Sequence, residues 1–299
     1  MVYWRDVKRY RSISRFVFDK KYGKNVVLYY NIGRFVLQNK KFPKSIVTDI
    51  DIVFPIVHGT NVEDGGLQGY LQTIGVPFVG SDVYASVVGQ DKVFMKDIWK
   101  ASKLPVTDYV WFYDVDYKQD SEDVIKKVEK LDYPVIVKPA TTGSSVGIAV
   151  CSTREELING IDDAIQYDKK ILVEEVVQHL KEVNIAVMGN YEHQKVSEIE
   201  EVISSNKFLT YADKYIGDDN GKLKGGKVPV KGTSKGMASA NRKLPADLDD
   251  KVRKEVEEVA IEAFKALGSS GNSRIDFLID EEKNKVYINE INSIPGSLA

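Results

Sequence analysis

The chain of 299 residues is 43% hydrophobic and 29% charged, the composition of a soluble globular protein of roughly two domains, with three small ones also compatible. Its formal net charge of −2 argues against nucleic-acid binding as the main function, and its single cysteine, Cys151, excludes an internal disulfide and fits a reducing compartment. No apolar run approaches the ~20 residues of a membrane span, and the N-terminus lacks the apolar core of a signal peptide, so we expect a cytoplasmic protein that does not enter a membrane.

The first 80 residues alternate short apolar runs with turn signals. The predicted elements are strands at 26–30, 34–37, 51–57 and 76–80 and a helix that begins near Leu67. The run 51–57 is nearly all apolar, as expected of a strand in a buried sheet, and a polar, glycine-rich loop at 58–66 follows it. Strand, loop, helix and strand in this order predict a parallel sheet with a ligand at the loop.

Two further units follow, from residue 81 and from about residue 179. The predicted helices cover 90–100, 121–131, a stretch after the capping pair Thr153 and Glu156, and 248–267 before Gly268. The predicted strands cover 105–112, 134–139, a stretch ending at Val150, 171–177, 182–188, 275–279 and 286–291. Residues 204–245 form a long polar segment, and segments of that length are usually disordered or functional lids.

The last two predicted strands form a hairpin whose polar residues recur at a spacing of two. Arg274 and Asp276 therefore share one face, and Glu290 and Asn292 repeat the pattern on the second strand. Oxygen ligands converging from paired strands suit a hard cation such as Mg²⁺, and an arginine beside them suits a phosphoryl group. The alternative is an ordinary hairpin with surface charges.

The region 134–177 contains candidate nucleotide contacts. Small residues at 141–147 would let backbone N–H groups approach phosphate oxygens, with Lys138 adding a positive charge, although a flexible hairpin is the alternative. Lys92, alone, is also explained as a solvated surface lysine. Glu174 and Glu175 interrupt an apolar strand, which indicates either an exposed edge or a hinge that holds an adenine.

Six features occur here in one order: Lys92, V-K-P with G-S-S-V-G, V-E-E-V-V with Glu182, D-K-Y, R-I-D and N-E-I-N-S-I-P-G. Their order and spacing resemble those of ATP-grasp ligases. H-G-T-N-V-E-D-G-G-L-Q-G, followed by V-G-S and Q-D-K, resembles more narrowly the D-alanine–D-alanine ligase family, and the resemblance covers about residues 50–299. It implies an α/β (α+β) ATP-grasp fold of three domains, at 1–80, 81–178 and 179–299, with ATP held between the second and third.

The resemblance also implies roles for the matching residues. Lys92 and Lys138 would contact the α- and β-phosphates, Glu174 and the backbone near Val177 the adenine, Glu182 the ribose and Lys214 the γ-phosphate. The full set implied for the nucleotide is Lys92, Lys138, Ser145, Glu174, Glu175, Val177, Glu182 and Lys214. The set implied for two Mg²⁺ (or Mn²⁺) ions is Asp276, Glu290 and Asn292. The set implied for the amino acids and the tetrahedral intermediate is His58, Ser144, Tyr215, Arg274 and Gly296.

The implied reaction is the ATP-dependent joining of two D-alanines through an acyl phosphate, for peptidoglycan precursors, by a homodimer that binds neither nucleic acid nor membrane. The alternatives are a related ligase that takes D-serine or another small second substrate, and a nucleotide-binding homologue without catalysis.

Two departures from the family pattern concern the ends of the sequence. Nothing in residues 1–24 matches the family's opening strand and ammonium-binding glutamate, and the chain stops at P-G-S-L-A where the family continues. We therefore expect a fragment of a longer protein that is poorly soluble, binds ATP and makes little dipeptide.

Overall fold

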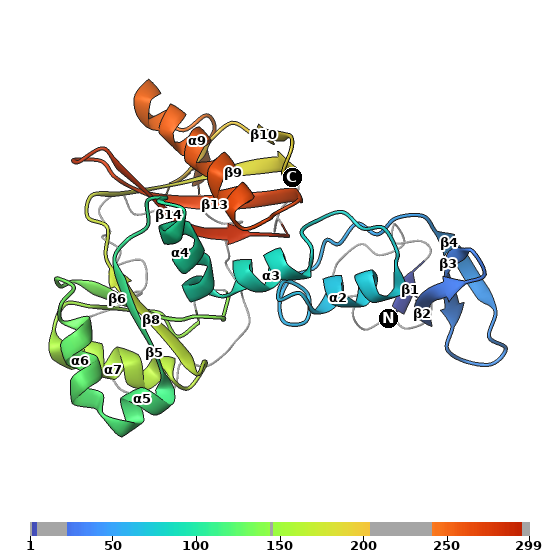
Figure 1. Ribbon diagram of the computed structural model, residues 1–299, viewed down its shortest axis with the longest axis horizontal. Helices are drawn as coiled ribbons and strands as arrows, with labels where there is room; N and C mark the ends of the chain where they lie inside the picture. Colours follow the sequence, from blue (N-terminus) through green and yellow to red (C-terminus); the bar gives the residue numbers. More distant parts are fainter. Residues whose placement is uncertain (1, 5–22, 144–145, 204–240, 295–299) are drawn as a thin grey trace. The chain divides into compact units, whose positions relative to one another are not determined.

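The computed structural model describes residues 2–4, 23–143, 146–203 and 241–294. The chain divides into two compact units (Figure 1). The first comprises Met1–Pro55 and Leu67–Val79, and the second comprises Ile56–Gly66 and Gly80–Ala299. Within the described residues no helix is both long and apolar enough to cross a membrane.

The first unit is an antiparallel sheet with one helix. The strands, in sheet order, are β1 (Val2–Trp4), β2 (Gly23–Asn31), β3 (Arg34–Asn39) and β4 (Ile46–Ile50), and the helix is α2 (Gly66–Ile74). The predicted strands at 26–30 and 34–37 are confirmed as β2 and β3. The turn between them has positive φ at Ile32 and Gly33, the backbone of a two-residue hairpin. The hydrophobic core cluster of this unit is formed by the buried side chains of Val26, Leu28, Leu37, Leu71 and Val76.

The predicted strand at 51–57 and the parallel sheet are wrong. Residues 51–57 make only an isolated parallel bridge between Val53 and Phe78, and every named strand pair in the described residues is antiparallel. The bridge cannot lengthen through Pro55, which has no N–H to donate. Ile52 and Phe54 are exposed, so the apolar run does not indicate burial on both faces.

The second unit contains two sheets, of which the first is covered on one face by helices. Its strands, in sheet order, are β5 (Tyr109–Tyr113), β8 (Lys170–Glu175), β6 (Val135–Pro139) and β7 (Ala149–Cys151). Helices α5 (Asp114–Gln119), α6 (Ser121–Val128) and α7 (Arg154–Ala164) lie together beside this sheet (Figure 1). Val135, Val137 and Val173 pack against these helices. Because side chains alternate along a strand, Ile136, Lys138 and Glu174 lie on the opposite face.

The helix ends are set by capping residues. Helix α3 (Val83–Gln90) is capped by Asp82, and α4 (Lys92–Ala101) begins after Asp91, so the helix predicted at 90–100 starts two residues later. At α7, Thr153 accepts a hydrogen bond from the Glu156 N–H as predicted, but the Glu156 carboxylate accepts from the N–H of Ser152 rather than from that of Thr153.

The second sheet of this unit carries the predicted C-terminal hairpin. Its strands, in sheet order, are β12 (Asn241–Lys243), β11 (Glu200–Ile203), β9 (Leu180–Gly189), β13 (Gly271–Asp280) and β14 (Lys285–Asn292), with β10 (Gln194–Val196) paired to β9. Helix α9 (Asp250–Ala266) confirms the amphipathic helix and packs its Val256, Ala260 and Phe264 on one face of the sheet. Ile275, Phe277 and Ile288 point to that helix, which leaves Arg274 and Asp276 on the other face.

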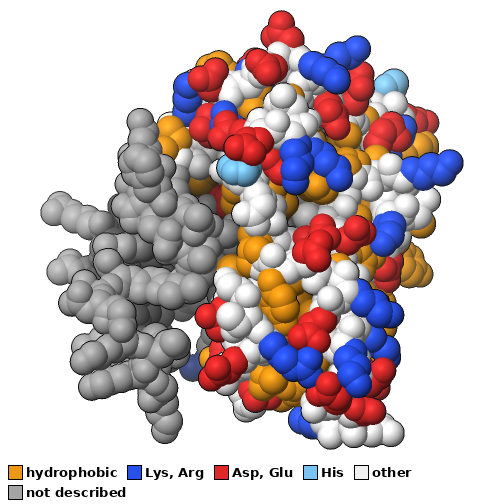
Figure 2. All heavy atoms as spheres, turned by 90° about the vertical axis from the view of Figure 1, so that its left-hand side faces the viewer, with side chains coloured by type: hydrophobic (Ala, Val, Ile, Leu, Met, Phe, Trp, Pro, Cys, Tyr) orange, Lys and Arg blue, Asp and Glu red, His pale blue; other side chains and the backbone are white. Residues whose placement is uncertain are grey.

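Helix α4 connects the two sheets. Its Met95 and Trp99 are buried in the core of the second sheet, and the Trp99 indole donates a hydrogen bond of 3.2 Å to the Ala263 carbonyl in α9. Its Lys96 reaches Glu174 on the first sheet. The face of the molecule seen in Figure 2 shows basic and acidic side chains interspersed among its described residues rather than gathered by sign.

Candidate nucleotide and metal site

The polar residues of the terminal hairpin are brought side by side by its register. Arg274 pairs with Asn292 and Asp276 pairs with Glu290, so all four lie in two adjacent rows on one sheet face. This alignment depends on a register shift between Asp276 and Phe277, which leaves Asn289 as an extra residue in β14. Without that bulge, Asn289 would stand opposite Asp276.

Among the carboxyl groups of this face, Asp276 has the most strongly shifted pKa. Arg274 donates to both of its oxygens, at 2.6 and 2.7 Å, and the Asn292 amide donates to one of them at 3.3 Å. Burial raises the pKa of Asp276 to about 7, and the charges of Glu290 and Glu182 add to the rise while Arg274 opposes it. The region thus holds more negative charge than Arg274 alone compensates.

The donors expected for a cation fit its chemistry, but they do not form a ready-made cage. Asp276, Glu290 and Asn292 offer carboxylate and amide oxygens, which hard cations prefer. In the part of the chain that is described, no group of three or more acidic, histidine or cysteine side chains is arranged to hold a metal. Both Asp276 oxygens contact Arg274, so a cation would share that carboxylate with the guanidinium.

Glu174 is the centre of a buried charge cluster rather than an exposed edge residue. Its strand, β8, lies between β5 and β6, and its side chain is 1% exposed. Lys96 lies 2.6 Å away, Lys138 donates to the other oxygen, and the Thr107 hydroxyl donates at 2.7 Å. Burial raises the pKa of Glu174, but the two ammonium groups outweigh it and hold the pKa below its usual range. Glu174 therefore fixes the positions of Lys96 and Lys138 relative to its strand.

Lys92 faces the same region from the start of α4. Its ammonium donates to the Thr142 carbonyl at 2.8 Å and its backbone N–H to the Ala140 carbonyl at 3.0 Å. Burial lowers the pKa of Lys92, which the carboxylate of Glu290 opposes and the ammonium of Lys138 reinforces. Lys92, Lys138 and Glu290, which come from a helix and both sheets, therefore lie within electrostatic reach of one another.

The predicted hinge at 174–177 borders an apolar cluster between the sheets. Val177 packs with Ile136, Val150 and Leu278, and the Lys138 ammonium donates to the Asn289 side chain at 3.4 Å. A small cavity of about 70 Å³ is lined by residues of the hinge and of the hairpin, among them Glu175, Val177 and Tyr287.

Several residues of the site give little or no signal in the sequence. Glu182, which the family resemblance already implied, lies in β9 opposite Leu278. Two residues further, the buried Asn184 stands in a cross-strand row with Asp276 and Glu290, and its Nδ2 finds no hydrogen-bond partner among the described residues. Spacing of two from Glu182 is the signal that places Asn184 on this face. The spacing of four between Lys92 and Lys96 places Lys96 on the same face of the predicted helix. No sequence pattern indicates Thr107 or Asn289.

The remaining predicted site residues are separate or outside the described residues. His58 is in an exposed loop, where its Nδ1 is 3.5 Å from a Glu63 oxygen. The residues whose positions lie outside the described ranges are Ser144, Ser145, Lys214, Tyr215 and Gly296.

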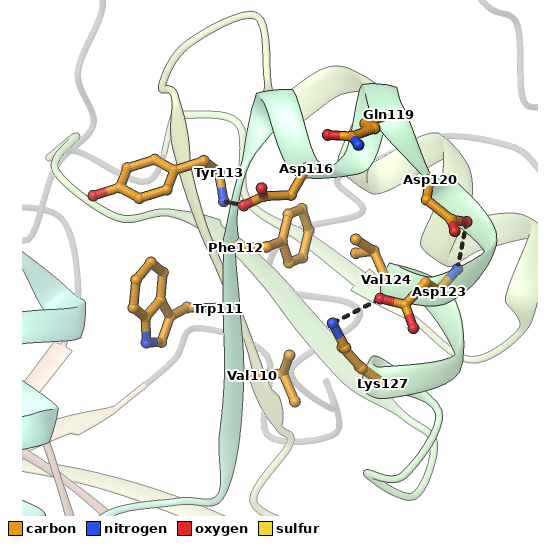
Figure 3. Close-up of a pocket in the computed structure, with 10 residues that line it drawn as sticks. All are labelled: Val110, Trp111, Phe112, Tyr113, Asp116, Gln119, Asp120, Asp123, Val124 and Lys127. Atoms are coloured by element: carbon orange, nitrogen blue, oxygen red, sulfur yellow. Dashed lines mark hydrogen bonds and ion pairs between the residues drawn. The ribbon is translucent and has the colours of Figure 1, made fainter.

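A larger cavity, of about 380 Å³, lies beside β5 and contains none of the predicted site residues (Figure 3). Its charged side chains make local contacts. Asp116 accepts from the Tyr113 N–H at 3.1 Å, Asp120 caps α6, and Asp123 pairs with Lys127 at 2.7 Å. Two of its four charged side chains are therefore held by neighbouring backbone, and the other two, Asp123 and Lys127, pair with each other.

Comparison with known proteins identifies the family of the chain. Residues 98–231 and 227–298 match the family model described as D-ala D-ala ligase C-terminus, and residues 19–81 match D-ala D-ala ligase N-terminus. The chain belongs to the D-alanine–D-alanine ligase family. The resemblance inferred from the motifs is confirmed, and so is the ATP-grasp fold that it implied.

Individual members of the D-alanine–D-alanine ligase family show how much of the chain is shared. The D-alanine–D-alanine ligase of Natranaerobius thermophilus is 40% identical over 255 residues, 85% of this chain and 64% of that protein. The VanG D-Ala:D-Ser ligase of Enterococcus faecalis has a TM-score of 0.78 at 29% identity, covering 99% of this chain and 77% of that one. The D-alanine–D-alanine ligase of Coxiella burnetii has a TM-score of 0.74 at 26% identity, covering 95% and 69%. The chain thus spans less than two thirds of the length of the Natranaerobius relative.

Proposed function

We propose that this protein is an ATP-dependent ligase that joins two D-alanines to D-alanyl-D-alanine for peptidoglycan precursors, in the cytoplasm and as a homodimer. The observation that carries the proposal is the convergence of Lys92 and Lys138 on the acidic hairpin: the Lys138 ammonium donates to the side chain of Asn289, next to Glu290, at 3.4 Å, and the charges of Lys138 and Glu290 both act on the pKa of Lys92. Positive charge from one sheet facing acidic oxygen donors from the other suits a metal-bound triphosphate. Membership of the D-alanine–D-alanine ligase family supports this class of reaction.

The nucleotide would lie between the two sheets. Its base would enter the apolar cluster of Ile136, Val177 and Leu278 and meet the backbone of the hinge, while Glu182 would take the ribose. Lys92 and Lys138 would hold the phosphates, because buried Glu174 neutralises only part of the charge of Lys96 and Lys138. Ser145 and Lys214 are proposed as further phosphate contacts, and Glu175 as a contact at the hinge.

Asp276, Glu290 and Asn292 would hold two Mg²⁺ (or Mn²⁺) ions, which would neutralise charge on the transferring phosphoryl group. Arg274 lies beside them and would stabilise the tetrahedral intermediate together with the Gly296 N–H. His58, Ser144 and Tyr215 are proposed to line the amino-acid site.

The proposed chemistry converts the carboxylate of D-alanine, which is a poor electrophile, into an acyl phosphate, which is a good one. A carboxylate oxygen of the first D-alanine attacks the γ-phosphorus of ATP, which releases ADP and leaves an acyl phosphate. The amine of the second D-alanine then attacks the acyl carbon, phosphate departs and a peptide bond remains. Binding, charge stabilisation and exclusion of water carry such a sequence, since water would hydrolyse the intermediate.

A second candidate takes D-serine as the second substrate. It is favoured by the likeness to the VanG structure, which covers 99% of this chain. The unusual Ser297 and Leu298, where D-alanine–D-alanine ligases commonly have other residues, point the same way.

The test uses the protein expressed from its complete gene. We expect phosphate release from ATP and Mg²⁺ that requires D-alanine, with D-alanyl-D-alanine identified by mass spectrometry. In competition with D-serine, a mixed dipeptide as the main product would favour the second candidate. ATP binding without any amino-acid-dependent phosphate release would instead show a homologue that binds nucleotide and does not catalyse.

A metal variant tests the acidic face in the same assay. Glu290→Gln removes one charge from the proposed cation site, so turnover should fall by about three orders of magnitude or more while the melting temperature changes little. Glu282→Gln, an exposed carboxylate in the turn of the same hairpin, is the matched control and should retain activity. Equal turnover in both variants would contradict the metal assignment.

A further inference from the structure

Lys170, at the start of β8, is a buried lysine with unusual surroundings. Its side chain is 8% exposed, and its ammonium lies 2.5 Å from an oxygen of Asp91. The ring centroid of Phe94 lies 3.6 Å from the ammonium, and those of Trp111 and Tyr113 lie 5.6 and 5.9 Å away. Trp111 and Tyr113 project to the same side of β5 (Figure 3), so the lysine is held by one carboxylate and aromatic faces.

The partner of Lys170 controls the start of helix α4. One oxygen of Asp91 binds Lys170, and the other accepts from the backbone N–H groups of Val93 and Phe94, at 2.9 and 3.2 Å. Asp91 is thus the N-cap of α4, and the first residue of that helix is Lys92. A single carboxylate therefore joins β8 to the helix turn that carries the proposed phosphate ligand.

The same end of β8 holds the segment after β6. The Lys170 carbonyl accepts from the Ala140 N–H at 2.9 Å, and Asp168 accepts from both the N–H and the hydroxyl of Thr141, at 2.6 and 2.8 Å. Lys92 bonds to this segment from the other side, through its backbone to Ala140 and its ammonium to Thr142. The Lys170–Asp91 pair connects these two sets of contacts.

We propose that Lys170 is a positioning residue for phosphate binding, which fixes the Lys92 ammonium relative to the Ala140–Thr142 backbone by holding Asp91. The proposal rests on the proposed function, because it assigns Lys92 to the nucleotide. A buried ion pair is weak evidence for a role in stability, since replacing one by well-packed apolar residues is often neutral or stabilising. The salt bridge between Lys170 and Asp91 adds fixed geometry. Such geometry matters most where a protein group must lie at a set distance from a charged ligand.

The experiment compares binding of ATP with binding of adenosine to the 1–299 chain, using calorimetry for ATP and saturation-transfer NMR for adenosine. Lys170→Met should weaken ATP binding about tenfold or more and leave adenosine binding unchanged, because only the phosphates meet Lys92. Lys170→Arg keeps the charge and should recover most of the affinity. Lys169→Met, the exposed neighbour in sequence, is the matched control and should bind ATP as the unmodified chain does.

Lys170→Met leaves the Asp91 carboxylate buried without its partner and risks unfolding. The double variant Lys170→Met/Asp91→Asn keeps a capping side chain and removes both charges, and it should fold yet show the same selective loss for ATP. Unchanged ATP affinity in a folded double variant would overturn the proposal, as would an equal loss for ATP and adenosine. Failure of the unmodified chain to bind ATP would instead count against the proposed function.

Discussion

At the scale of single residues, position in the sheet decides what a charge does. Glu174 and Glu175 are adjacent acidic residues in an apolar strand, and the sequence pattern alone predicts the same environment for both. The structure encloses Glu174 between Lys96 and Lys138, whereas Glu175 is partly exposed. The difference arises because β8 is an interior strand and every second side chain along it faces α4. The order of strands in the sheet cannot be predicted from the local sequence pattern.

Glu174→Gln should therefore destabilise the second unit. The amide keeps the shape but leaves two buried ammonium groups without their carboxylate, a change that costs about 3 kcal/mol or more. Urea unfolding followed by circular dichroism measures it, with Glu175→Gln as the matched control, expected within about 0.5 kcal/mol of the unmodified chain.

The same carboxylate gives a pH signature. The pKa of Glu174 is lowered in the folded protein, so its contribution is fully present above the ordinary glutamate pKa of about 4.3 and is lost as the pH falls below it. The gap in stability between the unmodified chain and Glu174→Gln should therefore be constant near neutral pH and shrink in acid. A gap that widened below that pH would contradict the buried ion pair.

At the scale of elements, most of the second unit could be predicted from its apolar periodicity and capping residues. The hairpin of β13 and β14 and helix α9 have strong signals of this kind, and the structure confirms them. The bulge at Asn289 could not be predicted, because an extra residue is visible only once the register of both strands is known. That bulge nevertheless decides that Glu290, and not Asn289, stands opposite Asp276.

The hairpin joining β6 and β7 contains a glycine that the backbone requires. Gly147 has φ of +70°, and a Cβ there would lie 2.6 Å from Tyr167 and 3.0 Å from Pro139. Gly147→Ala should lower the free energy of unfolding by about 1–2 kcal/mol through strain and contact together. Urea unfolding of each variant measures this.

Gly143→Ala in the same connection is the matched control, because a Cβ there meets nothing within 4 Å. It should leave stability within about 0.5 kcal/mol of the unmodified chain. Adding Tyr167→Ala to Gly147→Ala should recover the contact component and leave the backbone strain. If Gly143→Ala destabilised as strongly as Gly147→Ala, the assigned cause would be wrong.

At the scale of the whole molecule, the order of elements was a poorer guide than the elements themselves. The sequence of strand, helix and strand at 51–80 predicts a parallel sheet, yet the first unit pairs its strands in antiparallel fashion. Hydrophobic runs report local preference, whereas pairing depends on which segments meet in space. The motifs identified the family from short runs of residues in a fixed order, and the described residues proposed to contact the nucleotide lie in the second unit.

The division into two units leads to a last prediction. All described residues proposed to contact the nucleotide or the metals, from Lys92 to Asn292, lie in the second unit and after residue 80. A chain of residues 80–299 should therefore fold and bind ATP within about threefold of the affinity of the 1–299 chain, measured by calorimetry. Its melting temperature should fall, because the deletion also removes Gly65, which lies against Val83 and Val87 of α3. Glu290→Gln in the shortened chain should reduce the Mg²⁺ dependence of ATP binding as it does in the longer one. A folded 80–299 chain that did not bind ATP would show that the first 79 residues supply part of the nucleotide site.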